Sequence, residues 1–148
     1  MGYNGGNPGG ASNLSGGINN TGLIASTIVG VGVYNGSTLS EAINNSGTIT
    51  ARTFGVYLTV STLSGGLTNS GTIIGTAYDA IRVVNSDLSG GLTNSGKLEG
   101  GRYGLVMSNQ GSGNGNITNT GLISGATAAV AVTGSTLVGL ANAGTLAG

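Results

Sequence analysis

The side chains that could do acid–base or nucleophilic chemistry are few in this chain of 148 residues. Cysteine is absent, which excludes disulfides, thiol nucleophiles and zinc–thiolate sites. Charged residues make up 5% of the chain, against roughly 25% in typical soluble domains. They are Glu41, Asp79, Asp87 and Glu99, set against Arg52, Arg82, Lys97 and Arg102. A catalytic pair requires two carboxylates held close together, so the question is which elements position these eight residues.

The composition also disfavours several classes of partner. The formal net charge is zero, and no basic stripe exists to follow a phosphate backbone, so we expect no nucleic-acid partner. The longest apolar stretch, at 23–34, is shorter and more polar than the roughly 20 apolar residues that span a bilayer. We therefore expect no membrane insertion by this chain. The first ten residues, MGYNGGNPGG, lack the pattern of a signal peptide and suggest a flexible leader.

The element that must position any functional residue is a repeat built around the phrase Asn-Ser/Thr-Gly. Its glycines recur at successive spacings of 25, 24, 25, 25 and 23 residues. They are Gly22, Gly47, Gly71, Gly96, Gly121 and Gly144, and the asparagines two residues earlier are Asn20, Asn45, Asn69, Asn94, Asn119 and Asn142. Six copies fill nearly the whole chain after the leader, which indicates a repeat architecture.

Aliphatic residues occupy fixed places in each copy. One lies four positions before the phrase glycine, one lies two positions after it, and an alternating pair such as Val56/Leu58 or Ile81/Val83 follows. Glycine, serine and asparagine separate these short segments. The pattern predicts strand, turn, strand, turn and strand, with one face of each strand buried. The many glycines argue against helices, because each costs about 1 kcal/mol in a helix interior.

A period of about 24 residues is too short for a propeller blade and fits one coil of a parallel β-helix. We predict an all-β, right-handed parallel β-helix (β-solenoid) of about six coils of 23–25 residues, with about three short strands per coil. The expected organisation is a flexible Gly/Asn-rich leader at 1–11 and a single solenoid domain at 12–148. Its repeats are expected near 12–36, 37–60, 61–85, 86–110, 111–134 and 135–148.

The repeated asparagines and glycines are interpreted as structural. Alternation places the asparagines on the inward side at a corner, where their amides can bond turn backbone and form a stacked ladder. The glycines are expected to supply the freedom to turn. The Ser/Thr between them should point outward. The other reading, that these asparagines bind a ligand, is the weaker one.

Alternative chemistries fit less well. Polysaccharide-active β-helix enzymes gather acids and bases on one face, whereas Asp79 lies eight residues after its repeat's glycine and Glu99 three after its own. No two carboxylates share a column, so we expect no enzymatic activity and no catalytic residue. Glu99 and Arg102 are expected to form a surface pair worth less than about 1 kcal/mol, and Arg52 and Arg102 to solvate turns. Calcium-binding glycine-rich rolls need aspartates that are absent here, so we expect no metal or cofactor. An ice-binding threonine array is interrupted by Leu23, Lys97 and Leu122.

The repeat units resemble a known family. The units in question are INNSGTI at 43–49, LTNSGTI at 67–73, LTNSGKL at 92–98 and ITNTGLI at 117–123. They are similar to repeats of bacterial autotransporter passengers and related large secreted adhesins. The resemblance covers about residues 12–148 and is specific for architecture rather than activity. It implies a β-helix that is secreted or on the bacterial cell surface and that serves as a stalk, an adhesin or a self-associating surface.

We therefore expect a structural protein whose partners are other copies of itself or adjoining coils, with glycans or proteins of a host or bacterial surface as a further class of partner. Because the sequence stops within a copy, we expect either a fragment or processed product of a longer rod, or a filament subunit that stacks head-to-tail through its terminal coils.

Overall fold

The computed structural model describes residues 11–109 and 114–148. The expected leader, apart from Ala11, and residues 110–113 at the junction of two expected repeats lie outside the described residues. Within the described part the regular structure is entirely β, in 21 short strands and without a helix. None of this part could cross a membrane as a long apolar helix.

The strands form four parallel sheets, here named A to D in the order in which the chain visits them. Sheet A contains β1 (Asn13–Leu14), β5 (Thr38–Leu39), β9 (Thr62–Leu63) and β13 (Asp87–Leu88). Sheet B contains β2 (Ile18–Asn20), β6 (Ile43–Asn45), β10 (Leu67–Asn69), β14 (Leu92–Asn94), β17 (Ile117–Asn119) and β20 (Leu140–Asn142). Sheet C contains β3 (Leu23–Ser26), β7 (Thr48–Ala51), β11 (Thr72–Gly75), β15 (Lys97–Gly100), β18 (Leu122–Gly125) and β21 (Thr145–Ala147). Sheet D contains β4 (Val29–Tyr34), β8 (Phe54–Thr59), β12 (Asp79–Val84), β16 (Tyr103–Ser108) and β19 (Ala128–Thr133).

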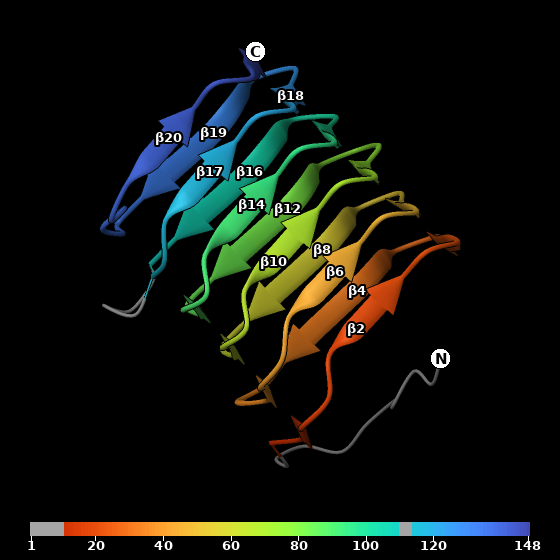
Figure 1. Ribbon diagram of the computed structural model, residues 1–148, viewed down its shortest axis with the longest axis vertical. Helices are drawn as coiled ribbons and strands as arrows, with labels where there is room; N and C mark the ends of the chain where they lie inside the picture. The colour runs from red at the N-terminus through yellow and green to blue at the C-terminus, as the bar shows by residue number, and fades with distance from the viewer. Residues whose placement is uncertain (1–10, 110–113) are drawn as a thin grey trace.

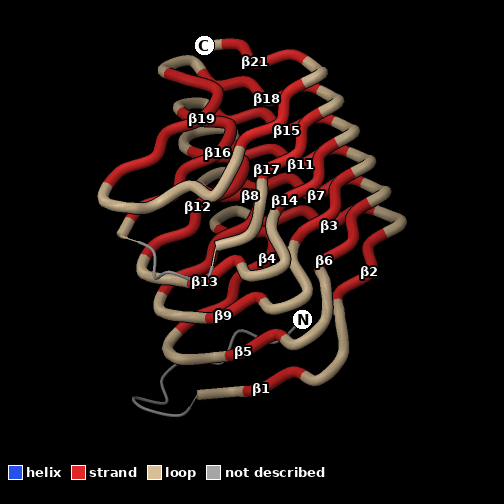
Figure 2. The backbone as a smooth tube through the Cα atoms, turned by 60° about the vertical axis from the view of Figure 1, so that its left-hand side comes forward, coloured by secondary structure: helices blue, strands red, loops and turns tan. Residues whose placement is uncertain are grey.

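The chain is a parallel β-solenoid, as predicted. Each strand pairs with the same strand of the copies before and after it, so Leu67 lies opposite both Ile43 and Leu92. Figure 2 shows the strands of each sheet one above another, from β1 at the bottom to β21 at the top. In Figure 1 the strands of sheet B cross the front from left to right, and the fainter strands of sheet D return behind them as the chain climbs. That path is a right-handed coil.

The count of strands per coil differs from the prediction. The first four coils each contain four strands rather than about three, because the Leu that opens each copy lies in a two-residue strand of sheet A. Two residues are too few to show an alternating pattern in the sequence; pairing with the neighbouring coils makes them a strand. A fifth coil follows, and β20 and β21 begin a sixth.

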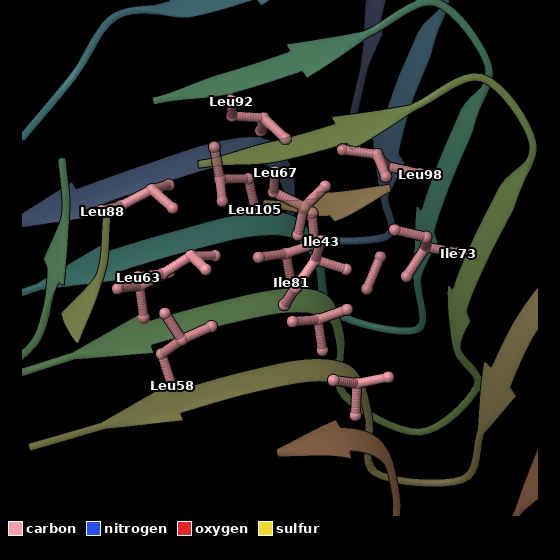
Figure 3. Close-up of a cluster of buried hydrophobic side chains, with 14 of the residues drawn as sticks. Ile43, Leu58, Leu63, Leu67, Ile73, Ile81, Leu88, Leu92, Leu98 and Leu105 are labelled. Carbon is pink, nitrogen blue, oxygen red and sulfur yellow. The ribbon is translucent and has the colours of Figure 1, made fainter. Parts of the chain in front are cut away.

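The core is a set of aliphatic stacks that run along the solenoid. Four core residues from one coil and its junction with the next are each at most 2% exposed; they are Ile43, Ile49, Leu58 and Leu63. Figure 3 shows such side chains from several coils meeting in the interior. Since each coil packs on near-copies of itself, leucine, isoleucine and valine suffice, and the chain needs no large aromatic residue in its core.

Candidate functional site

The repeated asparagines form a continuous ladder of hydrogen bonds inside the corner between sheets B and C. The Nδ2 of each asparagine donates to the Oδ1 of the asparagine in the following coil. The five distances are 2.7, 2.8, 2.8, 2.7 and 2.8 Å for the successive pairs Asn20–Asn45, Asn45–Asn69, Asn69–Asn94, Asn94–Asn119 and Asn119–Asn142. The predicted inward asparagine ladder is thus present in the structure.

Backbone groups complete the hydrogen bonding of the ladder. The Nδ2 of Asn69 also donates to Gly71 O at 3.2 Å within its own coil and to Lys97 O at 3.2 Å in the next. The backbone carbonyl of Asn69 accepts from the amides of Ser95 and Gly96, at 2.8 and 3.1 Å. Asn69 is fully buried, and a buried amide that is this well satisfied fixes the position of the turn rather than leaving a group to bind a ligand.

The phrase glycines stand where the ladder turns, but not for the expected reason. Their φ angles lie outside the left-handed region, so conformational freedom does not explain them. A Cβ on Gly71 would lie 2.0 Å from Gly47 O of the preceding coil, and one on Gly96 would lie 2.1 Å from Gly71 O. Glycine is required because successive coils approach each other too closely at this corner for any side chain.

The outward face of sheet B is polar. The Ser/Thr between Asn and Gly are exposed, as predicted, and lie beside a second exposed column that includes Asn19, Asn44 and Thr68. Asn44 Nδ2 donates to Asn19 Oδ1 at 2.9 Å. A shallow hollow of about 100 Å³ lies over these residues near Ser46 and Ser70. Its lining is uncharged, so it offers hydrogen bonds but no acid–base group.

Two of the four acids lie in ion pairs on different sheets. Asp79, fully buried at the start of β12, accepts from Arg82 Nη1 at 2.8 Å. Glu99 pairs with Lys97 on sheet C, so the predicted pair of Glu99 with Arg102 is wrong. Residues 97 and 99 are two apart on one strand and project from the same face, whereas Arg102 has passed the corner into the turn before sheet D. Among the described residues no three of His, Cys, Asp or Glu gather as metal ligands.

The sequence analysis missed two structural features, a column of residues and an ion pair. Asn35, Val60, Asn85 and Asn109, at the turn after sheet D, all have φ between 48° and 56°. The spacing of these residues repeats that of the ladder, and three of them are asparagine, which tolerates this conformation best among residues with a side chain. The fourth residue, Val60, is of a type that rarely adopts this conformation, so the column was not apparent in the sequence. The second feature is the ion pair of the buried Asp79 with Arg82 on the same strand, which the offset of Asp79 alone did not reveal.

No protein-family model, curated protein or solved structure gives a significant match to this chain. The β-solenoid architecture therefore rests on the coil geometry itself, and a link to autotransporters or adhesins rests on the resemblance of the repeat units alone.

Proposed function

We propose that this chain is a non-enzymatic structural rod of a bacterial surface or secreted protein, acting as a stalk, adhesin or self-association surface. The observation that carries the proposal is the continuity of the coil stack. Sheets B and C pair every described coil with the next in the same register, sheets A and D do so over four and five coils, and the asparagine ladder follows without interruption. A coil of this kind adds length without changing the fold.

The ion pairs of the acidic residues support a structural role. Asp79 and Glu99, the acids on sheets C and D, are held by neighbouring bases on separate faces. An acid and a base for glycoside hydrolysis would instead flank one bond from the same surface. The secreted or cell-surface location is supported by the resemblance of the repeat units to autotransporter passengers.

The rod is tested by duplicating one coil, residues 61–85, within the full chain. Small-angle X-ray scattering should show the maximum dimension increasing by about 4.8 Å per inserted coil. Urea unfolding should show stability that rises with the added coil, since the inserted copy gains a coil–coil interface. A chain that becomes less stable or does not lengthen would contradict the proposal.

A second candidate function, a filament that stacks head-to-tail, is favoured by the complementary ends of the described stack. Asn142 Nδ2 donates to Gly144 O and has no further acceptor among the described residues, while Asn20 Oδ1 has no donor there. Leu14 at one end and Leu140 at the other are 51% and 41% exposed, respectively, although their equivalents in the middle are buried. A further coil, of the same polypeptide or of a second copy, would satisfy both ends.

Negative-stain microscopy over a range of concentrations distinguishes the filament from the single rod. Leu146→Lys places a charge on an end stack that a second copy would cover, whereas Leu23→Lys adds the same charge on the outer face of sheet C. Filament formation predicts fibres that Leu146→Lys abolishes and Leu23→Lys preserves. A monomer at every concentration refutes the filament and leaves the single rod.

A further inference from the structure

The aromatic residues of the described chain all lie along one side of the solenoid, at sheet D and the turn that leads into it. They are Tyr34 on β4, Phe54 and Tyr57 on β8, Tyr78 just before β12, and Tyr103 on β16. Sheets A, B and C carry none among the described residues. This set, with the arginines beside it, is called the aromatic–arginine face.

The rings form a connected surface across successive coils. Tyr34 meets Tyr57 edge to face at 5.6 Å between centroids, Phe54 lies 4.7 Å from Tyr57, and Phe54 lies 5.9 Å from Tyr78. Tyr34 and Tyr78 are 37% and 43% exposed, respectively. Since the rings cover the outside of a sheet whose core is complete without them, packing of the fold does not account for their collection on one side.

The arginines divide into one that is neutralised and two that are not. Arg82 lies over the Phe54 ring at 5.6 Å and is held there by Asp79, whose Oδ1 is buried without a hydrogen-bond partner. Arg102 lies over Tyr78 and Tyr103 at 5.5 and 5.3 Å and forms no ion pair within the described residues. Arg52 is exposed and likewise forms none there.

Arg52 and Arg102 belong to the same corner, two coils apart. Ala77 N donates to Arg52 O at 2.7 Å, and Arg102 N donates to Tyr78 O at 2.7 Å, so the turn of Ala77 and Tyr78 lies between them. Coil stacking separates the two arginine backbones by about 9.6 Å. The corner therefore has two exposed arginines without an ion pair among the described residues, Arg102 over the ring of Tyr78 and Arg52 on the coil before that tyrosine.

We propose that the aromatic–arginine face binds an acidic polysaccharide, with uronate carboxylates at Arg52 and Arg102 and a sugar ring stacked on Tyr78. A guanidinium group binds a carboxylate through paired N–H donors, and the flat, apolar C–H face of a pyranose ring fits an exposed aromatic ring. The spacing of the two arginine backbones, about 9.6 Å, is close to the length of a disaccharide, which suits alternate units of a β-linked polyuronate. A face that spans several coils also fits an extended polymer better than a small molecule, which a concave pocket would enclose.

Single-stranded nucleic acid also uses aromatic rings and positive charge, but its backbone carries a phosphate at every nucleotide and requires a basic groove. Two arginines without an ion pair, on a chain of zero net charge, suit a polymer with fewer negative charges along its length. The polyuronate is therefore the favoured occupant, and an oligonucleotide serves as a competing probe.

The experiment measures binding of size-defined mannuronate oligomers to the full chain by isothermal titration calorimetry. Dextran oligomers of the same length and a poly-uridine oligonucleotide are the comparison ligands. We expect Arg102→Gln and Arg52→Gln each to weaken mannuronate binding about tenfold, the loss of one charge-assisted contact, and Tyr78→Ala to weaken it as well. Lys97→Gln removes an equal charge from sheet C and should change affinity less than about twofold, because Lys97 lies outside this face.

Circular dichroism of each variant verifies the fold. All four side chains are at least partly exposed, and the two arginine variants test two separate contacts of the same face. Added salt should weaken the binding of mannuronate oligomers. Absence of mannuronate binding, equal binding of dextran, tighter binding of the oligonucleotide, or an equal effect of Lys97→Gln and Arg102→Gln would each overturn the proposal.

Discussion

Replacing Asn69 by alanine removes one rung from the middle of the ladder and is the sharpest perturbation of its structural role. The side chain accepts from Asn45 at 2.8 Å, and its two Nδ2 hydrogens are shared among Asn94 Oδ1 at 2.8 Å, Gly71 O at 3.2 Å and Lys97 O at 3.2 Å. A net contribution of about 1 kcal/mol for each bond sets the scale of the loss.

The cost is concentrated at one neighbour. Asn45 Nδ2 keeps its bonds to Gly47 O and Thr72 O, but Asn94 Oδ1 loses the donor that the ladder supplies. Asn94 is fully buried, and an unsatisfied buried acceptor costs about 1–3 kcal/mol. We expect Asn69→Ala to lower the free energy of unfolding by about 3 kcal/mol or more.

Urea unfolding of the full chain, followed by far-ultraviolet circular dichroism, measures this loss as a shift of the midpoint at unchanged slope. Thr68→Ala is the matched control, because Thr68 is the exposed neighbour on the same strand. Asn142→Ala is the second control and should cost less than about 1 kcal/mol, since water can replace the bonds of this exposed rung. If Asn69→Ala falls within about 0.5 kcal/mol of Thr68→Ala, the ladder contributes nothing beyond a surface residue and the reasoning fails.

The remaining predictions concern three other features. Gly71→Ala should destabilise the fold by more than about 3 kcal/mol, since its Cβ would meet Gly47 O, whereas Gly22→Ala, with nothing within 4 Å, should be nearly neutral in the same urea assay. Val60→Asn should raise stability by about 1 kcal/mol, because Val60 is 53% exposed and held at φ 48°; an unchanged midpoint would contradict this. Burial, and then the nearby Tyr57, raise the pKa of Tyr34 above 10.0, which favours its neutral form in the folded chain. The associated stability is present below pH 10 and is lost as pH rises through the raised pKa, so Tyr34→Phe should unfold less steeply with alkaline pH; an identical pH profile would exclude this contribution.

The architecture was predictable because the sequence repeats and because each core position recurs in every copy. Ile49, Ile73 and Leu98, for example, occupy one column in the sequence and one stack in the structure. The asparagine ladder followed from the same register. In both cases a residue contacts the equivalent residues of the copies before and after it, so aligning the copies in the sequence already identifies the contacts.

Features that depend on two different columns were not predictable in this way. The contact between Arg102 and Tyr78 joins residues of successive coils at a corner, where strand alternation stops and the direction of a side chain cannot be read from spacing. The reason for the phrase glycines was missed because it lies in the distance between coils, not in the local turn. Sheet A was missed because a strand of two residues has no periodicity.

The central claim is that the Asn-Ser/Thr-Gly phrases of successive copies lie in contact as one buried ladder. The most direct measurement is a nuclear Overhauser spectrum of the side-chain amide protons of Asn45, Asn69 and Asn94 in the full chain. The coil stack predicts cross-peaks from the Asn69 amide protons to Asn94 of the next copy, together with slow exchange of these protons with solvent. Cross-peaks confined to the residue's own copy, or amide protons that exchange as fast as those of exposed Asn44, would contradict it.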